Sequence, residues 1–360
     1  MRTADPLTAP PTEVMSHLLP RLMCLLALVP LGATQAADQP PHYRITHQVP
    51  LPGDEGWDYL LYDQQGQRLF VSHGSRVLVV DGEKLTVTGE IPGTPGVHGI
   101  ALAPDLDRGY ISAGRAGSVV VFELKTLARL KEIKVTGENP DAILYDPATH
   151  RVLTFNGRGR NVTAIDAKTD EVVGTLAVDA KPEFAATDGK GRVYVNLEDR
   201  NSLAALDPQQ VALLSTWPLP GCDKPSGLAI DAAHGRLFPV CGSKVMLVVD
   251  AASGKVLGSA PIGAGVDAAA YDPATRLAFA SCGEGVLTVV RVDASGRPEV
   301  AESLATQRGA RTMALDLEKH RVFLVTADFS PPPPATAEQP HPRPSIAPGS
   351  VRLLVLESGS

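Results

Sequence analysis

Five side chains that can bind a cation recur at the starts of similar short segments: Asp58, His98, Asp141, Glu183 and Asp267. Each carboxylate lies five residues before a turn motif that recurs along the chain, and His98 lies one residue outside this register. Carboxylate oxygens are the ligands that Ca²⁺ and Mg²⁺ prefer, whereas one histidine alone is a poor basis for a zinc site. If the fold brings these side chains together, we expect a candidate divalent-cation site.

The same carboxylates could instead be neutralised by the protein itself. Arg311 occupies the register of the carboxylates in the last repeat, and Lys224 precedes the corresponding segment of the fifth repeat. Like charges a few ångströms apart raise one another's pKa unless a cation lies among them. Carboxylates neutralised by Arg311, Lys224 and water need no function. A cation site and a neutralised cluster are therefore both open interpretations. Trp57, beside Asp58, is a further ligand-binding candidate.

Three arginines suggest a separate anion-binding patch. Arg158, Arg160 and Arg200 lie in loops of neighbouring repeats, after the second β-rich run of each. Guanidinium groups bind carboxylates and phosphates in a bidentate manner. The alternative is that they are exposed and solvated.

The elements that must position these residues follow an internal repeat. The segments LLYD, ALAP, ILYD, AATD, LAID, AAYD and MALD end at residues 63, 104, 146, 188, 231, 272 and 316, at intervals of 41 to 44 residues. Each is followed by a turn, a β-rich run such as RVLTFNG, and a third run such as VTAID. A fourth run follows in six of the units. Aspartate at the turn caps backbone N–H groups, so we expect Asp146 and its counterparts to be structural.

Seven units of four short strands predict an all-β fold, a seven-bladed β-propeller over residues 42–357. The seventh unit lacks its fourth strand, and residues 43–50, YRITHQVP, supply it. The ring then closes with both chain ends in one blade, which removes the exposed sheet edges. In this arrangement the candidate cation ligands all lie at one mouth of the central channel.

The repeat resembles the YncE-like family of YVTN β-propeller repeat proteins. The clearest copy is residues 141–178, DAILYDPATHRVLTFNGRGRNVTAIDAKTDEVVGTLAV, with the patterns xYDPATxRV and VxVIDxxTxxVxxxI. The resemblance covers about 42–357 and implies the propeller, whereas activity does not follow from it because propellers host unrelated functions. Some members of that family are described as binding single-stranded DNA, but no stacking platform or basic groove is visible in this sequence.

Charge and targeting signals limit the partners. The chain of 360 residues has a formal net charge of −7 without long runs of Lys or Arg, which disfavours nucleic acid. Residues 1–36 are typical of an export signal, with Arg21, the apolar run Leu22–Gly32 and small residues at 33–36, and Met15 is a better start than Met1. No second apolar span follows, so we expect a periplasmic or secreted protein without a transmembrane segment in the mature chain.

Three cysteines and a Pro-rich segment are further features of the channel-mouth face. Cys222 and Cys241 both fall there and could form a disulfide, while Cys282 stands at the position of Cys241 one blade later. The Pro-rich segment 328–350 is inserted between the second and third strands of blade seven. It is either an exposed loop or a semi-rigid lid that carries His341 and Arg343 toward the mouth.

These observations favour an exported binding or scaffold module that acts through the channel-mouth face on an unknown protein or small-molecule ligand. The first alternative is a metal-dependent hydrolase of the lactonase type that uses the acidic mouth, although the matching inner-strand Asn of such enzymes is missing. The second is the propeller subunit of a periplasmic redox assembly. No residue is assigned a catalytic role, because no nucleophile elbow, phosphate loop, haem attachment or HExxH motif is present.

Overall fold

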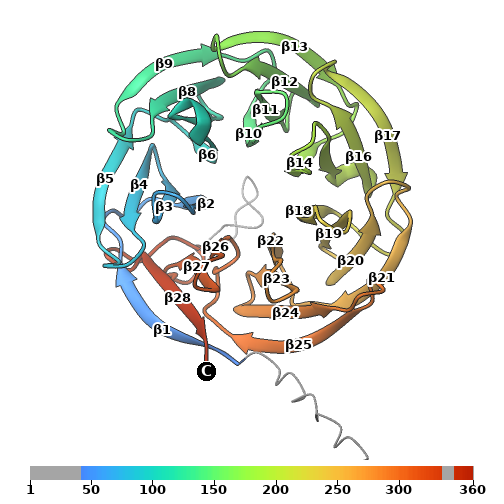
Figure 1. The fold of residues 1–360 in the computed structure, drawn as a ribbon. Coiled ribbons are helices and arrows are strands. Elements are labelled where there is room, and N and C mark those ends of the chain that lie inside the picture. The colour runs from blue at the N-terminus through green and yellow to red at the C-terminus, as the bar shows by residue number, and fades with distance from the viewer. Residues whose placement is uncertain (1–41, 335–343, 360) are drawn as a thin grey trace, which may run out of the picture. The chain divides into compact units, whose positions relative to one another are not determined.

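The computed structural model describes residues 42–334 and 344–359, which form seven four-stranded antiparallel sheets arranged in a ring (Figure 1). The predicted all-β, seven-bladed propeller is therefore confirmed. The predicted export segment and the centre of the Pro-rich insertion, with His341 and Arg343, lie outside the described residues. Within those residues, no helix is long and apolar enough to cross a membrane.

The first four blades follow one another along the chain, each running from the channel outward. Blade one is β2 (Trp57–Asp63), β3 (Arg68–His73), β4 (Arg76–Asp81) and β5 (Val87–Pro92). Blade two is β6 (Val97–Ala103), the 3₁₀ turn η1 (Pro104–Leu106), β7 (Arg108–Ala113), β8 (Ser118–Glu123) and β9 (Arg129–Lys134). Blade three is β10 (Pro140–Asp146), β11 (Arg151–Asn156), β12 (Asn161–Asp166) and β13 (Glu171–Ala177). Blade four is β14 (Pro182–Thr187), β15 (Val193–Leu197), η2 (Glu198–Arg200), β16 (Ser202–Asp207) and β17 (Ala212–Pro218).

The last three blades complete the ring. Blade five is β18 (Pro225–Asp231), β19 (Arg236–Cys241), β20 (Val245–Asp250) and β21 (Val256–Pro261). Blade six is β22 (Val266–Asp272), β23 (Leu277–Cys282), β24 (Val286–Val292) and β25 (Pro298–Ala305). Blade seven is β26 (Met313–Asp316), β27 (Arg321–Thr326), β28 (Arg352–Ser358) and β1 (Tyr43–Pro50).

Blade seven closes the ring with strands from both ends of the described chain. Its sheet order is β1-β28-β27-β26, and β1 pairs antiparallel with β28 along its whole length. Tyr43 at the start of β1 is only 1% exposed and packs edge-on against Phe279 of blade six, with ring centroids 5.5 Å apart. The N-terminal strand therefore also holds blade seven against blade six.

The hydrophobic core lies between the faces of neighbouring blades. Alternate side chains of the middle strands fill these interfaces, as a pleated strand with two packed faces requires. Phe70 of blade one meets Phe122 of blade two at 5.8 Å between centroids, and both side chains are fully buried. Seven apolar clusters of this kind surround the channel and fix the inner strands that carry the candidate site.

The recurring aspartates cap the turns between the first and second strands. Asp63 accepts the backbone N–H of Gly66 at 3.0 Å, and Asp146 accepts that of Thr149 at 3.0 Å. The following arginine completes the turn in blade seven, where Arg321 forms an ion pair with Asp316 at 2.7 Å. These carboxylates accept hydrogen bonds within the turns and have the structural role that the repeat predicted.

The Pro-rich insertion leaves blade seven between β27 and β28. At its described base, Phe329 and Ile346 form an antiparallel bridge, and the N–H of Ser330 donates to the carbonyl of Ser345 at 2.9 Å. The ring of Phe329 lies 6.2 Å from that of Trp57, so this base packs against blade one.

Candidate functional site

One polar side chain from each of the seven blades lines the mouth of the channel. These side chains, which we call the polar ring, are Asp58, His98, Asp141, Glu183, Ser226, Asp267 and Arg311. All of them line a single cavity of about 780 Å³. The structure therefore brings together every metal candidate named from the sequence.

A local irregularity aims the ring side chains at the channel. In blades one to six the register of the inner strand shifts next to the ring residue, for example between Trp57 and Leu60 and between Pro140 and Ile143. A bulge bends a strand and re-aims a side chain. The recurring proline before Asp141 and Glu183 fits this position because it begins the strand.

The register assigned to His98 from the sequence was wrong by one residue. Val97 pairs with Ala113 as Trp57 pairs with His73, so His98 rather than Gly99 is the counterpart of Asp58. The physical reason is that blade two has Ala103 where other blades have the capping aspartate, and its turn is instead the 3₁₀ turn that begins at Pro104.

Gly99 lets blades two and three approach closely at this level. A side chain there would place its Cβ 2.8 Å from Cγ2 of Ile143 and 3.1 Å from the carbonyl oxygen of Asp141. Only glycine allows this approach without a shift of the backbone. The result is that His98 stands next to Asp141 of the following blade.

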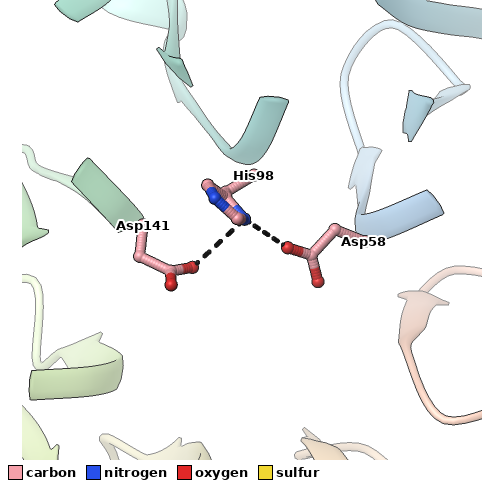
Figure 2. A group of neighbouring side chains, drawn as sticks. All are labelled: Asp58, His98 and Asp141. Carbon is pink, nitrogen blue, oxygen red and sulfur yellow. Dashed lines mark hydrogen bonds and ion pairs between the residues drawn. The ribbon is translucent and has the colours of Figure 1, made fainter. Parts of the chain in front are cut away.

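Asp58, His98 and Asp141 form the most compact part of the polar ring (Figure 2). Nδ1 of His98 lies 2.6 Å from Oδ2 of Asp58 and 3.6 Å from Oδ1 of Asp141. The three possible ligand atoms lie within 4.8 Å of one another. Each side chain is about three-quarters buried, with 24%, 26% and 20% exposure for Asp58, His98 and Asp141.

The other ring carboxylates have permanent cations as partners. Nε of Arg311 lies 2.7 Å from Oδ2 of Asp267, across blades seven and six. Nζ of Lys181 forms an ion pair with Glu183 and lies 2.5 Å from Oε2 of Glu198. Asp58 and Asp141 are therefore the ring carboxylates whose ion-pair partner, within the described chain, is the imidazole of His98.

An aromatic pair closes the channel directly below the ring. Tyr59 of blade one and Phe184 of blade four stack with centroids 4.4 Å apart and planes 19° apart. Their blades lie on opposite sides of the channel in Figure 1, so the stack spans the opening. The polar ring lines the wall, and this aromatic pair the floor, of one cavity, which we call the mouth cup.

The hydroxyl of Tyr59 has no hydrogen-bond partner within the described residues although its oxygen is buried. Burial raises the pKa of this phenol, and the charges of Asp141, Asp58, Glu183 and Asp267 raise it further. Tyr59 lines the cup together with the four ring carboxylates. A buried polar group without a partner is costly, so this hydroxyl lowers the stability of the fold.

Burial perturbs the ring carboxyls. It raises the pKa of Asp141 from 3.8 to about 6, with His98 opposing the shift and Asp58 adding to it. Burial also raises the pKa of Glu183 against the attraction of Lys181, and raises that of Asp267 against the attraction of Arg311. Desolvation thus dominates at each site, and it makes the carboxylate form more costly.

The imidazole of His98 is shifted in the direction that favours a proton. Burial lowers its pKa, but the hydrogen bond with Asp58 and the charges of Asp141, Asp58 and Glu183 outweigh burial and raise the pKa overall. The proton on Nδ1 then sits between two carboxylates. The protonated imidazole of His98 thus supplies a positive charge that offsets the negative charge of Asp58 and Asp141.

Buried side chains of the second strands hold the ring in place. The hydroxyl of Ser112 in blade two donates to the carbonyl of Asp141 in blade three at 2.5 Å and accepts the N–H of Gly99 at 2.8 Å. In the same way Asn196 of blade four donates to the carbonyl of Ser226 in blade five at 2.9 Å. Similar bonds join Ser72 to His98 and Ser281 to Arg311. The ring backbone is therefore tied from blade to blade.

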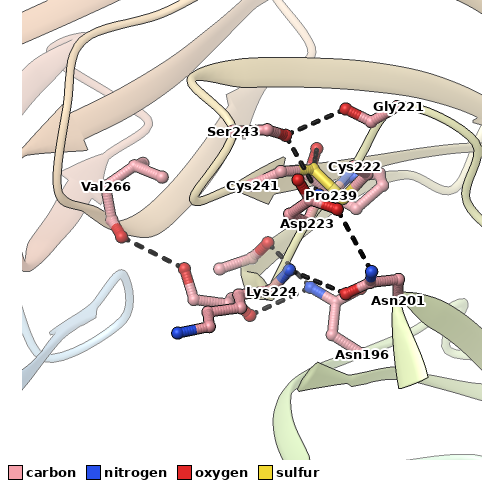
Figure 3. The surroundings of a disulfide bond; sticks show 12 residues. Asn196, Asn201, Gly221, Cys222, Asp223, Lys224, Pro239, Cys241, Ser243 and Val266 are labelled. Atoms are coloured by element: carbon pink, nitrogen blue, oxygen red, sulfur yellow. Dashed lines mark hydrogen bonds between the residues drawn. A yellow bond between two sulfur atoms is a disulfide. The ribbon is translucent and has the colours of Figure 1, made fainter. Parts of the chain in front are cut away.

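A disulfide fixes the rim of the cup at blade five (Figure 3). Cys222, in the loop before β18, is bonded to Cys241 at the end of β19, and both are buried. Among the described residues, Cys282 has no disulfide partner, and it is buried. The loop that the disulfide closes carries Lys224, whose backbone N–H donates to the side chain of Asn201 at 2.9 Å and whose side chain lines the cup.

Four ligand-binding candidates named from the sequence do not line the cup: Trp57, Arg158, Arg160 and Arg200. Trp57 is 8% exposed and belongs to the apolar core beneath Phe329, because the bulge turns Asp58 rather than Trp57 to the channel. Arg160 pairs with Asp199 at 2.6 Å, and Arg200 donates to the carbonyl of Asp179 at 3.4 Å. The three arginines therefore do not act as one anion-binding patch, because Arg160 and Arg200 have partners within the fold, whereas Arg158 lines a second cavity.

Sequence reasoning also missed members of the cup. Tyr59 and Phe184 directly follow the ring residues Asp58 and Glu183, at a register where blades two and five have glycine. Two large aromatics at one register were a usable signal of a channel plug. Lys181 was also missed, although it lies only two residues before its partner Glu183.

Comparison with known proteins supports the fold alone. The structure of U3-55K is 9% identical, with 87% of this chain and 98% of that chain covered and a TM-score of 0.69. A chain of a mitotic checkpoint complex is 12% identical over 95% of this chain and 100% of its own, with a TM-score of 0.71. The WD40 repeats of RRP9 are 9% identical over 89% and 99%, with a TM-score of 0.71.

At these identities the likeness shows the fold alone, a seven-bladed β-propeller. No family model matches this sequence, and no curated protein matches it. The function must therefore be argued from the cup itself.

With every carboxyl ionised, the cup carries more negative than positive charge. Its lining holds the carboxylates Asp58, Asp141, Glu183, Glu198 and Asp267, and the permanent cations Lys181, Lys224 and Arg311. A proton on His98 offsets one of the two surplus negative charges. An acidic, half-buried cup of this kind can hold a divalent cation or a positively charged group of a ligand.

Proposed function

We propose that this protein is a ligand-binding module whose binding site is the mouth cup. The observation that carries the proposal is the convergence of one polar side chain from every blade above an aromatic floor. Polar residues that only line a water-filled channel do not require an aromatic pair across that channel. A ligand-binding site is a concave pocket, and the stack of Tyr59 on Phe184 supplies its floor. The structural likeness to WD40 propellers is consistent with a binding or scaffold role.

The ligand includes a divalent cation, Ca²⁺ or Mg²⁺, held by Asp58 and Asp141. Their carboxylates are the pair left without a permanent cation, and oxygen ligands suit both ions. Nδ1 of His98 occupies the position between them with a proton. Cation and proton therefore compete for the same two carboxylates, and the ion binds when the proton leaves.

The module works outside the cytoplasm. The export signal predicted within residues 1–36 and the disulfide between Cys222 and Cys241 support this proposal, because disulfides persist in oxidising compartments. The resemblance of residues 141–178 to YncE-like repeats agrees with it. A periplasmic or secreted location exposes the cup to extracellular Ca²⁺.

Elemental analysis of the purified protein tests the cation. After equilibration with Ca²⁺ and Mg²⁺ at pH 8 and gel filtration, we expect one ion per chain, removed by chelator. The variants Asp58→Asn and Asp141→Asn each lose it, because each removes one oxygen charge from the pair. Asp105→Asn, which changes a carboxylate hydrogen-bonded to Tyr145 away from the cup, is the control and retains the ion. Absence of any ion from the wild type under these conditions would refute the cation.

A metal-dependent hydrolase of the lactonase type is the second candidate function. One observation favours it: burial raises the pKa of Glu183, whose carboxyl lies in the same cup and could act as a general base at neutral pH. We expect such an enzyme to hydrolyse a small lactone only with the ion present, and Glu183→Gln to abolish the reaction while the ion is retained. Lack of turnover by the ion-loaded wild type on a lactone panel would reject this candidate and leave the binding module intact.

A further inference from the structure

A second cavity opens on the same face, between blades two and three. It measures about 710 Å³ and lies between the β7–β8 and β11–β12 hairpin tips, with residues 135–139 along its side. Arg115 and Arg158 occupy equivalent positions in the two hairpins and both line this cavity, which we call the arginine cleft. Two equivalent guanidinium groups thus face one space from adjacent blades.

Neither guanidinium is used to hold the fold together. Within the described residues, Arg115 and Arg158 make no side-chain hydrogen bond or ion pair, and both residues are exposed. Their neighbours differ: Arg160 donates to Asp199 and to the carbonyl of Asp179, and Arg200 donates to that carbonyl as well. The two arginines that line the cleft are therefore the free ones of this group.

The floor of the cleft is kept clear of side chains. Gly96, Gly114, Gly117 and Gly137 all line it, so much of the surface is backbone. At Gly114 a Cβ would lie 2.7 Å from Nε2 of His98 and 2.9 Å from Oδ1 of Asn139. Any larger residue would cover the imidazole edge, and glycine leaves it open to the cleft.

His98 consequently lines both cavities with different ring nitrogens. Its Nδ1 faces Asp58 in the mouth cup, and its Nε2 edge lies at Gly114 in the cleft. Arg115 and Arg158 therefore face one space whose lining includes the imidazole edge of His98.

We propose that the arginine cleft is an anion-binding site, separate from the cation site of the cup, for a ligand that carries a carboxylate or phosphate group. Guanidinium groups bind both anions in a bidentate manner, and the backbone floor lets the anion approach without a steric barrier. One carboxylate, that of Glu138, also lines the cleft and opposes the anion. Replacing Glu138 with a neutral residue therefore tests whether the site prefers a negatively charged ligand.

Isothermal titration calorimetry at low ionic strength tests the site with two probes, inorganic phosphate and succinate, on the full chain. We expect saturable binding of at least one probe, and the probe that binds more tightly identifies the anion class. Arg115→Gln and Arg158→Gln each weaken it by at least about tenfold, because each removes a charge-assisted pair of hydrogen bonds. Glu138→Gln strengthens it. Arg297→Gln, an exposed arginine of the β24–β25 hairpin, is the matched control and leaves it unchanged.

The outcomes separate the proposal from its alternatives. Both variant arginines are exposed, so the fold is expected to survive, and thermal denaturation of each variant verifies it. No saturable binding of either probe to folded wild type overturns the proposal. Equal affinity of Arg115→Gln or Arg158→Gln and wild type overturns it as well, because the site requires both guanidinium groups.

Discussion

At the scale of single residues, the polar ring departs from what stability alone would select. Asp141 is mostly buried and its nearest cationic group is an imidazole 3.6 Å away. Its carboxyl pKa of about 6 means that the folded protein holds the acid form more readily than the unfolded chain does. Groups with pKa values perturbed in this way gather at functional sites, where stability is sacrificed for binding.

The pKa of Asp141 predicts how stability depends on pH. Because the folded-state pKa of about 6 lies above the ordinary 3.8, the stabilisation from its proton is complete below pH 3.8 and is lost as the pH rises through 6. At pH 8 without added metal, Asp141→Asn should therefore raise the free energy of unfolding, by up to about 3 kcal/mol. Urea denaturation at pH 5 and pH 8 measures this gain, which should shrink at the lower pH.

Asp267→Asn is the matched control at another ring position. Its carboxylate pairs with Arg311 at 2.7 Å, so the amide leaves that guanidinium without its ion pair. Because burial also raises the pKa of Asp267 against this attraction, we expect a smaller gain at pH 8 from this change than from Asp141→Asn. A lower stability of Asp141→Asn than of wild type at pH 8 would contradict the assignment of an uncompensated charge to Asp141.

At the scale of strands, the ring depends on bonds that cross from one blade to the next. Ser112 on β7 satisfies both the N–H of Gly99 on β6 and the carbonyl of Asp141 on β10. A propeller blade meets its neighbour mainly through apolar faces, which are not directional. The hydrogen bonds of the buried serine and asparagine side chains are directional. They fix the position of the ring residues they reach relative to the neighbouring blade.

Loss of one hydrogen bond between blades should lower the free energy of unfolding, whereas loss of a buried hydroxyl that makes no such bond should not. Ser112→Ala leaves two buried backbone groups without partners, so we expect a loss of about 1–3 kcal/mol in the free energy of unfolding. Ser202→Ala removes a buried hydroxyl that has no hydrogen-bond partner within the described chain and should change stability by less than about 0.5 kcal/mol. Equal effects of the two substitutions in urea denaturation would remove the proposed role of Ser112.

At the scale of the whole molecule, the ring is closed by a strand that is far away in sequence from its neighbours. Tyr43 of β1 packs on Phe279, and its N–H donates to Glu302 of blade six at 2.9 Å. We expect Tyr43→Ala to lower the free energy of unfolding by about 3–5 kcal/mol, as for other buried aromatics. Arg44→Ala, at the exposed neighbouring position, should change it little. Similar thermal denaturation of both variants would show that closure does not depend on this contact.

The repeat made the architecture predictable, while the site was predictable only in part. Turn aspartates and alternating apolar runs are local signals, so seven blades and the closing strand 43–50 followed from the sequence. The ring residues also followed, except that His98 was displaced by one position where Ala103 replaces the capping aspartate. The pairing of Arg160 with Asp199 joins different blades, and no local pattern encodes it, whereas the stack of Tyr59 on Phe184 left a signal only in the shared register of the two aromatics.

The competition between proton and cation in the mouth cup is tested most directly by calorimetric titration of Ca²⁺ and Mg²⁺ at pH 6 and pH 8. The pKa values of His98 and Asp141 are both raised, so binding must release protons and tighten as the pH rises. We predict one ion per chain, at least about tenfold higher affinity at pH 8 than at pH 6, and no binding to Asp141→Asn. Equal affinity at the two pH values, or no saturable binding of either ion at pH 8, would contradict the account.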